Sequence, residues 1–290
     1  MSDVLEVRDL CLRFRGYSGM SEVLHGISLN VRAGERVALV GESGSGKSVT
    51  ARIVLGLLQE LPSARVEGGL FFEGEDLNRL SRRQWQALRG TSISMIFQDP
   101  TSSLNPVFTI GTQFAEVLRR RDPKLSREAA DERAGTLLQS VSIHDHARVL
   151  SAYPFQLSGG MNQRVVIAMA LANHPSLLIA DEPGTALDVT VQAQTLKLMH
   201  ELVERSGTAV LFISHNLGVV REFADRVFVI YRGRIVEQGP TRAIFEDPGH
   251  AYTRALMAAV PRITGGGLPE LNDSESAFLD PMVVHEGGKA

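Results

Sequence analysis

Cysteine is almost absent from this sequence. Cys11 is the only cysteine among 290 residues, so the chain alone builds neither an internal disulfide nor a cysteine-based metal or iron–sulfur site. Such cysteine usage is typical of proteins in a reducing cytosol. The opening segment, MSDVLEVRDL, also lacks the basic start and apolar stretch of a secretion signal.

Long hydrophobic runs and a large excess of charge are missing as well. The longest apolar run, from Val165 to Ala172, falls far short of the about 20 residues needed to cross a bilayer, and we expect a buried helix there. The formal net charge of -3 provides no broad basic surface for binding nucleic acid by counterion release. Nucleic acid is therefore not an expected partner.

Hydrophobic residues make up 43% of the chain, which is enough for a substantial core. We expect one main domain over residues 1–261. The remaining residues, 262–290, are rich in glycine and acidic side chains and predict a loosely ordered C-terminal tail.

Short apolar runs alternate with helical patterns, which predicts an α/β fold with a mainly parallel core sheet. The runs expected to form buried strands are residues 37–40, 93–97, 177–180, 209–213 and 227–231. Ligands of such sheets bind at the carboxyl ends of strands. Between residues 110 and 149 the apolar residues instead recur at helical spacing among many charges, which predicts an inserted helical subdomain over about residues 99–160.

A glycine-rich segment after the first of these strands matches the pattern GxxxxGK[ST]. A plain turn between strand and helix is the simpler alternative. The strand, the loop and the helical pattern that begins at Lys47 together favour a nucleotide-binding phosphate loop, in which backbone N–H groups and the lysine hold phosphates and Ser48 binds magnesium. The residues expected to bind ATP here are Gly41, Glu42, Ser43, Gly44, Ser45, Gly46, Lys47, Ser48 and Val49.

Two adjacent carboxylates, Asp181 and Glu182, end another predicted strand. A solvated turn would also explain them. Beside a phosphate loop, however, Asp181 suits a Mg²⁺ ligand and Glu182 suits the group that polarises an attacking water. His215 follows a further strand, where it could contact the γ-phosphate, although a lone histidine is often structural.

The segment LSGGMNQR contains Ser158, Gly159 and Gly160 and precedes the acidic pair. A serine N-cap would explain a helix start but not its coincidence with the other motifs. The segment resembles the signature motif of ABC ATPases, and the resemblance extends to about Pro261. It implies a P-loop ABC ATPase domain with an N-terminal antiparallel β subdomain, in which each ATP lies between one subunit's phosphate loop and another subunit's signature.

The resemblance also assigns several other residues. Gln98 matches the glutamine that touches magnesium and water, and Asp188 ends the Ala186-Leu187-Asp188 segment that lies across the dimer interface. An aromatic near the N-terminus should stack on adenine, with Phe14 the first choice and Tyr17 the second, although either could simply pack on the first strands. The expected magnesium ligands are Ser48, Gln98 and Asp181, and the expected catalytic residues are Glu182, His215 and Gln98.

Several longer stretches, such as MIFQDPTSSLNPVFTIG and GHAYTRALMAAVP, resemble the first of the two ATPases of oligopeptide, dipeptide and nickel uptake systems. This implies a hydrolysing importer subunit at the cytoplasmic face of the membrane. Its partners would be a second, non-identical ATPase, two permease subunits and, indirectly, an extracytoplasmic binding protein. The chain departs from these relatives at Asn162, Gly184 and Asn216, and it lacks their cysteine-rich tail segment, so no iron–sulfur cluster is expected.

Other functions fit the sequence less well. Soluble ABC proteins of translation or DNA repair usually have two ATPase units or a long coiled coil. A stand-alone kinase or GTPase would lack the LSGGM segment, and a regulatory, non-hydrolysing half would not need Asp181, Glu182 and His215 together. His144 and His146 flank Asp145, but this set is incomplete for a metal site, and we expect a solvated loop.

Overall fold

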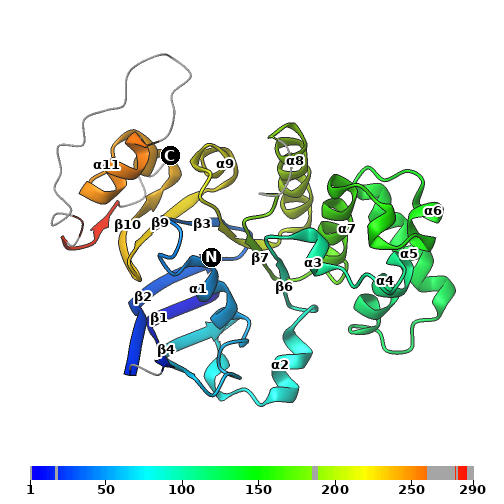
Figure 1. The fold of residues 1–290 in the computed structure, drawn as a ribbon, viewed down its shortest axis with the longest axis horizontal. Coiled ribbons are helices and arrows are strands. Elements are labelled where there is room, and N and C mark those ends of the chain that lie inside the picture. The colour runs from blue at the N-terminus through cyan, green and yellow to red at the C-terminus, as the bar shows by residue number, and fades with distance from the viewer. Residues whose placement is uncertain (1, 17–18, 185–188, 260–277, 279, 286–290) are drawn as a thin grey trace. The chain divides into compact units, whose positions relative to one another are not determined.

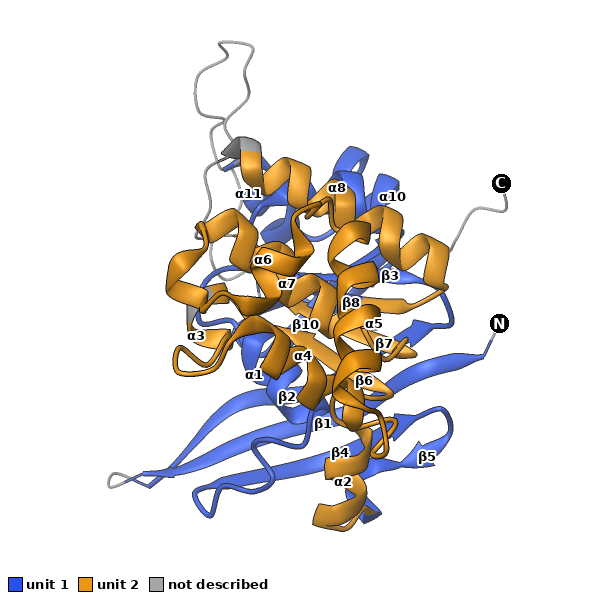
Figure 2. Cartoon of the chain, turned by 90° about the vertical axis from the view of Figure 1, so that its right-hand side faces the viewer, with its two compact units in different colours: residues 1–79, 211–290 blue, residues 80–210 orange. Residues whose placement is uncertain are grey.

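The computed structural model describes residues 2–16, 19–184, 189–259, 278 and 280–285. Contacts divide the chain into two compact units, coloured separately in Figure 2. Unit 1 comprises residues 1–79 and 211–290, and unit 2 comprises residues 80–210. Within the described residues, no helix combines the length and the apolar character that a bilayer-crossing segment needs.

Unit 1 contains an antiparallel sheet in the order β2-β1-β4-β5, of which Figure 1 labels β1 and β2, in blue, and β4, in cyan. Its long strands alternate between buried and exposed residues, as expected for a sheet with one face on a core. This sheet confirms the predicted N-terminal antiparallel β subdomain. Its elements are β1 (Asp3–Gly16), β2 (Gly19–Arg32), β4 (Ala64–Phe72) and β5 (Glu75–Asp76), followed by the 3-10 turn η1 (Leu77–Arg79).

The second set of strands in unit 1 runs in the order β11-β10-β9-β3. β3 (Arg36–Val40) pairs in parallel with β9 (Arg226–Tyr231), and β9 pairs antiparallel with β10 (Arg234–Pro240). Val37 to Val40 are fully buried, which explains why this strand is apolar throughout. The helices of this unit are α1 (Lys47–Val54), α9 (Leu217–Phe223), α10 (Thr241–Glu246) and α11 (Ala251–Ala258).

One short strand comes from the segment for which composition predicts loose order. β11 (Val283–Val284) pairs in parallel with β10, with Val283 opposite Glu237. His285 continues this attachment, because its backbone N–H donates to the carbonyl of Gln238 at 2.9 Å. Residues 283–285 therefore pair with β10, and two of the three are valines, which favour strands.

Unit 2 carries β6 (Ile93–Ile96) and β7 (Leu177–Asp181), which pair in parallel. β8 (Ala209–Ile213) begins at the end of unit 2 and ends in unit 1. All the apolar runs expected to be strands are strands, except that Phe97 lies just beyond β6. The helices of unit 2 are α2 (Arg82–Leu88), α3 (Pro100–Ser103), α4 (Ile110–Arg119), α5 (Arg127–Ser140), α6 (His146–Ser151), α7 (Gly159–Leu171) and α8 (Val189–Ser206), with the 3-10 turn η2 (Pro154–Gln156).

Helices α4 to α6 lie where the sequence predicts a helical subdomain. α4 starts at the N-cap Thr109 and α5 at the N-cap Ser126, and each hydroxyl accepts a backbone N–H of the first turn. Their apolar stripes meet in a core that includes Ala115, Leu118 and Ala130. Side-chain caps and an apolar stripe thus define these helices, while α7, which holds the long apolar run, is buried along most of its length.

Candidate functional site

The loop between β3 and α1 is closely packed against the rest of unit 1. Gly46 is the N-cap of α1, with a φ of 111°. A Cβ on Gly41 would lie 2.1 Å from the carbonyl oxygen of Ile230, and one on Gly46 would lie 2.6 Å from a methyl group of Leu24. Space therefore requires glycine at position 41, where the clash is with backbone, and the left-handed φ favours glycine at position 46.

Lys47 folds back over this loop. Its ammonium donates to the carbonyl oxygens of Gly41 at 2.8 Å and Glu42 at 2.7 Å, and the residue is only 5% exposed. Ser45 is buried too, and its hydroxyl has no hydrogen-bond partner among the described residues. A buried ammonium, an unsatisfied hydroxyl and the N-terminus of α1 form a donor set that fits phosphate oxygens. The loop thus fits the triphosphate of a nucleotide.

In unit 2, two side chains meet at the carboxyl ends of β6 and β7. Gln98 donates its amide N–H to the carboxylate of Glu182 at 3.0 Å. Glu182 has a φ of 50°, a left-handed conformation that is costly for a residue with a Cβ. Asp181 ends β7 and is 5% exposed. The parallel pairing of β6 and β7 explains this juxtaposition, because it aligns the residues that follow both strands.

Residues 158–160 form the start of α7 and are open to solvent at their first two positions. Ser158 is the N-cap, and its hydroxyl accepts the N–H of Met161 at 3.3 Å. A Cβ on Gly160 would lie 2.9 Å from a methyl group of the Val191 side chain and within 4 Å of no other atom of the described residues outside α7. The segment therefore offers free backbone N–H groups at an accessible helix N-terminus.

Comparison with known proteins shows the family. Residues 24–185 match the family model described as ABC transporter. The chain belongs to the ABC transporter family. Residues 236–282 match a second model, the oligopeptide/dipeptide transporter C-terminal region. As expected from the resemblance, the chain is similar to ATP-binding subunits of this branch of the ABC family.

Two similar proteins support the assignment to this branch of the family. The chain is 49% identical over 268 residues to the oligopeptide transport ATP-binding protein OppD of Bacillus subtilis (strain 168), covering 92% of this chain and 75% of the relative. It is 45% identical over 280 residues to the dipeptide transport ATP-binding protein DppD of the same organism, covering 97% and 82%.

Solved structures agree with the α/β fold assigned from the sequence. A dimeric post-hydrolysis ATP-binding cassette bound to ADP and Pi is 28% identical, with a TM-score of 0.72 and coverage of 82% of this chain and 99% of that chain. A cassette from Clostridium perfringens, part of an ABC transporter complex, is 27% identical with a TM-score of 0.70, covering 91% and 98%. ABC cassettes thus share the fold over most of this chain.

The other residues expected in the ABC site lie as follows. Phe14 is half-buried on β1, and His215 is exposed just after β8. Tyr17 and Asp188 lie outside the described residues. The phosphate loop, Phe14 and His215 belong to unit 1, whereas Gln98, Ser158 to Gly160, Asp181 and Glu182 belong to unit 2.

The structure shows what the side chains do at two of the positions where the chain departs from related ABC subunits. Asn162 is buried, and its amide donates to the carbonyl of Pro154 at 3.0 Å, which ties the start of α7 to η2. Asn216 is the N-cap of α9, where its side chain accepts the N–H of Val219. Asparagine and aspartate cap helices about equally well, so this change preserves the helix start.

The segment from His144 to His146 is held by local contacts. Asp145 pairs with Arg148 at 2.9 Å, and the His146 ring lies 3.4 Å from the Gln139 amide. Across the described residues, no group of three or more histidine, cysteine, aspartate and glutamate side chains is arranged to hold a metal ion.

Sequence reasoning missed one residue at the phosphate loop. The backbone N–H of Glu42 donates to the phenol oxygen of Tyr252 at 3.0 Å, although the two residues are 210 positions apart. Tyr252 lies in the YTRALMAAVP stretch, which indicated the subfamily but gave no sign of a contact with the loop. A long-range contact of this kind has no local sequence signal.

Proposed function

We propose that this chain is the ATP-hydrolysing subunit of a binding-protein-dependent ABC importer of dipeptides or oligopeptides. The cargo class rests on similarity to OppD and DppD and on the match of residues 236–282. Hydrolysis rests on one observation above all: the hydrogen bond that joins Gln98 to Glu182 beside the buried Asp181.

The phosphate loop would hold the triphosphate of ATP. Lys47 would donate to phosphate oxygens while keeping the Gly41 carbonyl as an acceptor, since an ammonium has three N–H donors, and Ser45 would gain a partner for its buried hydroxyl. Ser48, Gln98 and Asp181 would supply oxygen ligands of the kind that Mg²⁺ prefers, and magnesium would neutralise phosphate charge. Phe14 is the proposed adenine-stacking residue.

Glu182 would act as the general base in this scheme. Its carboxylate accepts a hydrogen bond from Gln98 now, and the same carboxylate oxygen would accept a proton from the attacking water. Gln98 would orient that water with its amide. His215 would donate a hydrogen bond to the γ-phosphate as charge develops.

The accessible signature segment supports a paired arrangement. Residues 158 and 159 are exposed, and the free N–H groups at the start of α7 face no described acceptor. We infer that they cover an ATP bound to a second, non-identical ATPase, whose own signature covers the ATP on this chain. Such a pair forms the ATP site only when both subunits are present.

Exposed hydrophobic side chains in unit 2 support membrane subunits as further partners. Val107 is 71% exposed and Phe155 is 72% exposed, and Phe155 stacks on Tyr153 with ring centroids 5.6 Å apart. Contiguous exposed apolar surface, such as that of the stacked Tyr153 and Phe155, commonly marks an interaction site. We propose that they contact the permease pair at the cytoplasmic face of the membrane, so that the ATPase drives import without touching the cargo.

A Glu182→Gln variant tests the assignment. Removing the general base should lower kcat for ATP hydrolysis by about 100-fold or more, while ATP binding is kept and the ATPase pair accumulates in the closed state. Turnover and bound nucleotide are measured on the assembly purified from membranes, with Glu222→Gln, an exposed change on α9, as the matched control. Normal turnover by Glu182→Gln would remove Glu182 from this role.

A Lys47→Ala variant tests binding separately. Loss of a charged donor should weaken ATP binding by about tenfold or more, which a nucleotide-binding titration measures. Lys124→Ala, at an exposed position, is the control. Unchanged ATP affinity in Lys47→Ala would contradict the phosphate-binding role. Recovery of the chain without permeases or a second ATPase would contradict the proposed assembly.

A further inference from the structure

A single peptide group of the phosphate loop is held at both ends. The carbonyl of Gly41 accepts the Lys47 ammonium at 2.8 Å, and the N–H of the same peptide, on Glu42, donates to the Tyr252 hydroxyl at 3.0 Å. Rotation of this peptide would break both bonds. The orientation of the Lys47 acceptor is therefore coupled to a residue of the C-terminal region.

Tyr252 is itself firmly placed. It lies in the first turn of α11, where its backbone N–H donates to the ring of the N-cap His250 at 3.1 Å. The backbone N–H groups of Gly249 and His250 donate to the carboxylate of Glu237 on β10 at 2.7 and 3.2 Å. Glu237 is fully buried. A buried carboxylate that accepts these bonds fixes the start of α11 and with it the direction of the Tyr252 side chain.

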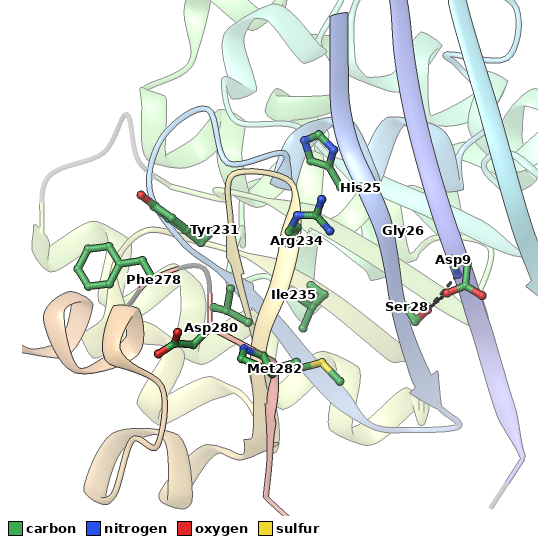
Figure 3. Close-up of a pocket in the computed structure, with 12 residues that line it drawn as sticks. Asp9, His25, Gly26, Ser28, Tyr231, Arg234, Ile235, Phe278, Asp280 and Met282 are labelled. Atoms are coloured by element: carbon green, nitrogen blue, oxygen red, sulfur yellow. Dashed lines mark hydrogen bonds between the residues drawn. The ribbon is translucent and has the colours of Figure 1, made fainter. Parts of the chain in front are cut away.

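Aromatic packing fixes the ring as well. The ring centroids of Tyr252 and Tyr231 lie 4.3 Å apart. The ring of Phe278 packs edge-on against both, with its centroid 5.6 Å from that of Tyr252 and 5.7 Å from that of Tyr231. Figure 3 shows Tyr231 and Phe278 at one end of a pocket of about 630 Å³, with Asp9 and Ser28 at the other end. Phe278 precedes the residues that form β11, so the C-terminal segment contributes directly to the packing around Tyr252.

The Tyr252 phenol carries no charge at physiological pH. Burial raises the pKa of Tyr252 to about 12. A neutral hydroxyl accepts the Glu42 N–H without introducing a negative charge beside the loop that binds phosphate. Orientation of the loop is thus achieved without electrostatic repulsion of the ligand.

From these contacts we propose that Tyr252 is a positioning residue of the phosphate loop: its hydroxyl sets the Gly41–Glu42 peptide, and through it Lys47, in the conformation that binds nucleotide. The C-terminal region, anchored by Glu237 and Phe278, thereby controls nucleotide affinity. This inference rests on the proposed function. It adds a residue that contacts neither the phosphates nor the reacting water.

Two tyrosines in the same cluster provide a matched experiment. Tyr252→Phe removes only the hydroxyl that the loop uses and keeps the ring packing. Tyr231→Phe removes a hydroxyl from the neighbouring ring, for which the structure records no hydrogen bond among the described residues. We expect Tyr252→Phe to weaken ATP binding and raise KM for ATP by about fivefold, the value of one neutral hydrogen bond, with kcat nearly unchanged. Tyr231→Phe should match the wild type.

Hydrogen exchange provides a second measurement that does not depend on turnover. In the nucleotide-free full chain, the Glu42 amide should exchange faster in Tyr252→Phe than in Tyr231→Phe, because it has lost its acceptor. Thermal unfolding of both variants without nucleotide separates a general loss of stability from a local change in the loop.

The outcomes distinguish this inference from the proposed function. If the wild type binds ATP and Lys47→Ala does not, but Tyr252→Phe binds ATP normally with unchanged Glu42 exchange, the positioning role is overturned and the proposed function stands. Equal weakening by both tyrosine variants would assign the effect to packing and also overturn it. Failure of the wild type to bind ATP would overturn the proposed function itself.

Discussion

The phosphate loop and the signature segment contain similar residues but differ in their exposure to solvent. Both have glycines and a serine at the start of a helix, α1 in one case and α7 in the other. In the loop, Ser45, Gly46 and Lys47 are buried, and the backbone of Ile230 lies too close to Gly41 to leave room for a Cβ. In the signature, Ser158 and Gly159 are exposed.

This difference indicates which of the two segments has its conformation fixed by contacts with the rest of its own unit. The loop is shaped by contacts within its own unit, from Ile230, Leu24 and Tyr252, so its conformation is set before nucleotide arrives. The signature is shaped by its own helix start and by the bond from Asn162 to Pro154. Substitutions at loop positions packed against backbone should therefore affect folding and binding together, whereas those in the signature should affect catalysis in the paired assembly.

The largest effect is expected for Gly41→Ala. The new methyl group would lie 2.1 Å from the Ile230 carbonyl oxygen, which belongs to backbone and cannot move aside. We expect a loss of about 3 kcal/mol in the free energy of unfolding and no measurable ATP binding. Chemical denaturation of Gly41→Ala against Gly16→Ala checks this, since Gly16 does not have a left-handed φ and a Cβ there would lie 3.8 Å from the Gly19 carbonyl oxygen, an ordinary contact distance. Equal stability of the two variants would show that the loop is not shaped by its surroundings.

Gly160→Ala should produce the reverse pattern. The nearest atom is a methyl group of the Val191 side chain at 2.9 Å, and a side chain can adjust, so the unfolding free energy should change by less than about 1 kcal/mol. ATP hydrolysis by the assembled pair should fall by about tenfold, because the partner's phosphates would meet a displaced surface. ATP binding by this chain alone should not change. Weaker binding by the isolated chain would contradict the division between the two surfaces.

A smaller effect is expected at Asn162, whose buried side chain joins the start of α7 to η2 by a hydrogen bond. Asn162→Ala removes the hydrogen bond to the Pro154 carbonyl and should lower the unfolding free energy by about 1 kcal/mol. Thermal unfolding measures the loss, and Asn216→Asp, which keeps a helix cap, is a control that should be neutral. Unchanged stability in Asn162→Ala would mean that this bond does not hold the start of α7.

The smallest effect is expected for Ser45→Ala in the loop. The Ser45 hydroxyl is buried with no partner among the described residues, so its removal should leave the stability of the nucleotide-free protein unchanged or slightly higher. ATP affinity should fall by about threefold, because the hydroxyl would bind phosphate. Isothermal titration of both proteins decides the point, and equal affinity would assign the hydroxyl no part in binding.

Local patterns were sufficient for much of the fold and for parts of the site. The apolar runs that became β3, β7, β8 and β9 are buried strands, because the side chains of a strand covered on both faces must be apolar. The loop at Gly41 to Ser48 and the acidic pair could also be selected as candidates, because the chemistry of phosphate and magnesium requires particular residues at fixed spacing, and their roles stay proposals. The pairing of Gln98 with Glu182 was not, since it depends on which strands become neighbours.

By itself, the sequence determined the buried core strands and singled out the phosphate-loop pattern and the residue types that suit hydrolysis, since these depend on short-range periodicity and on chemistry at fixed spacing. Only the tertiary structure decided that Tyr252 supports Glu42 from 210 positions away and that residues 283–284 add a strand to β10. Contacts between distant segments follow from packing, which brings together residues with no regular spacing along the chain.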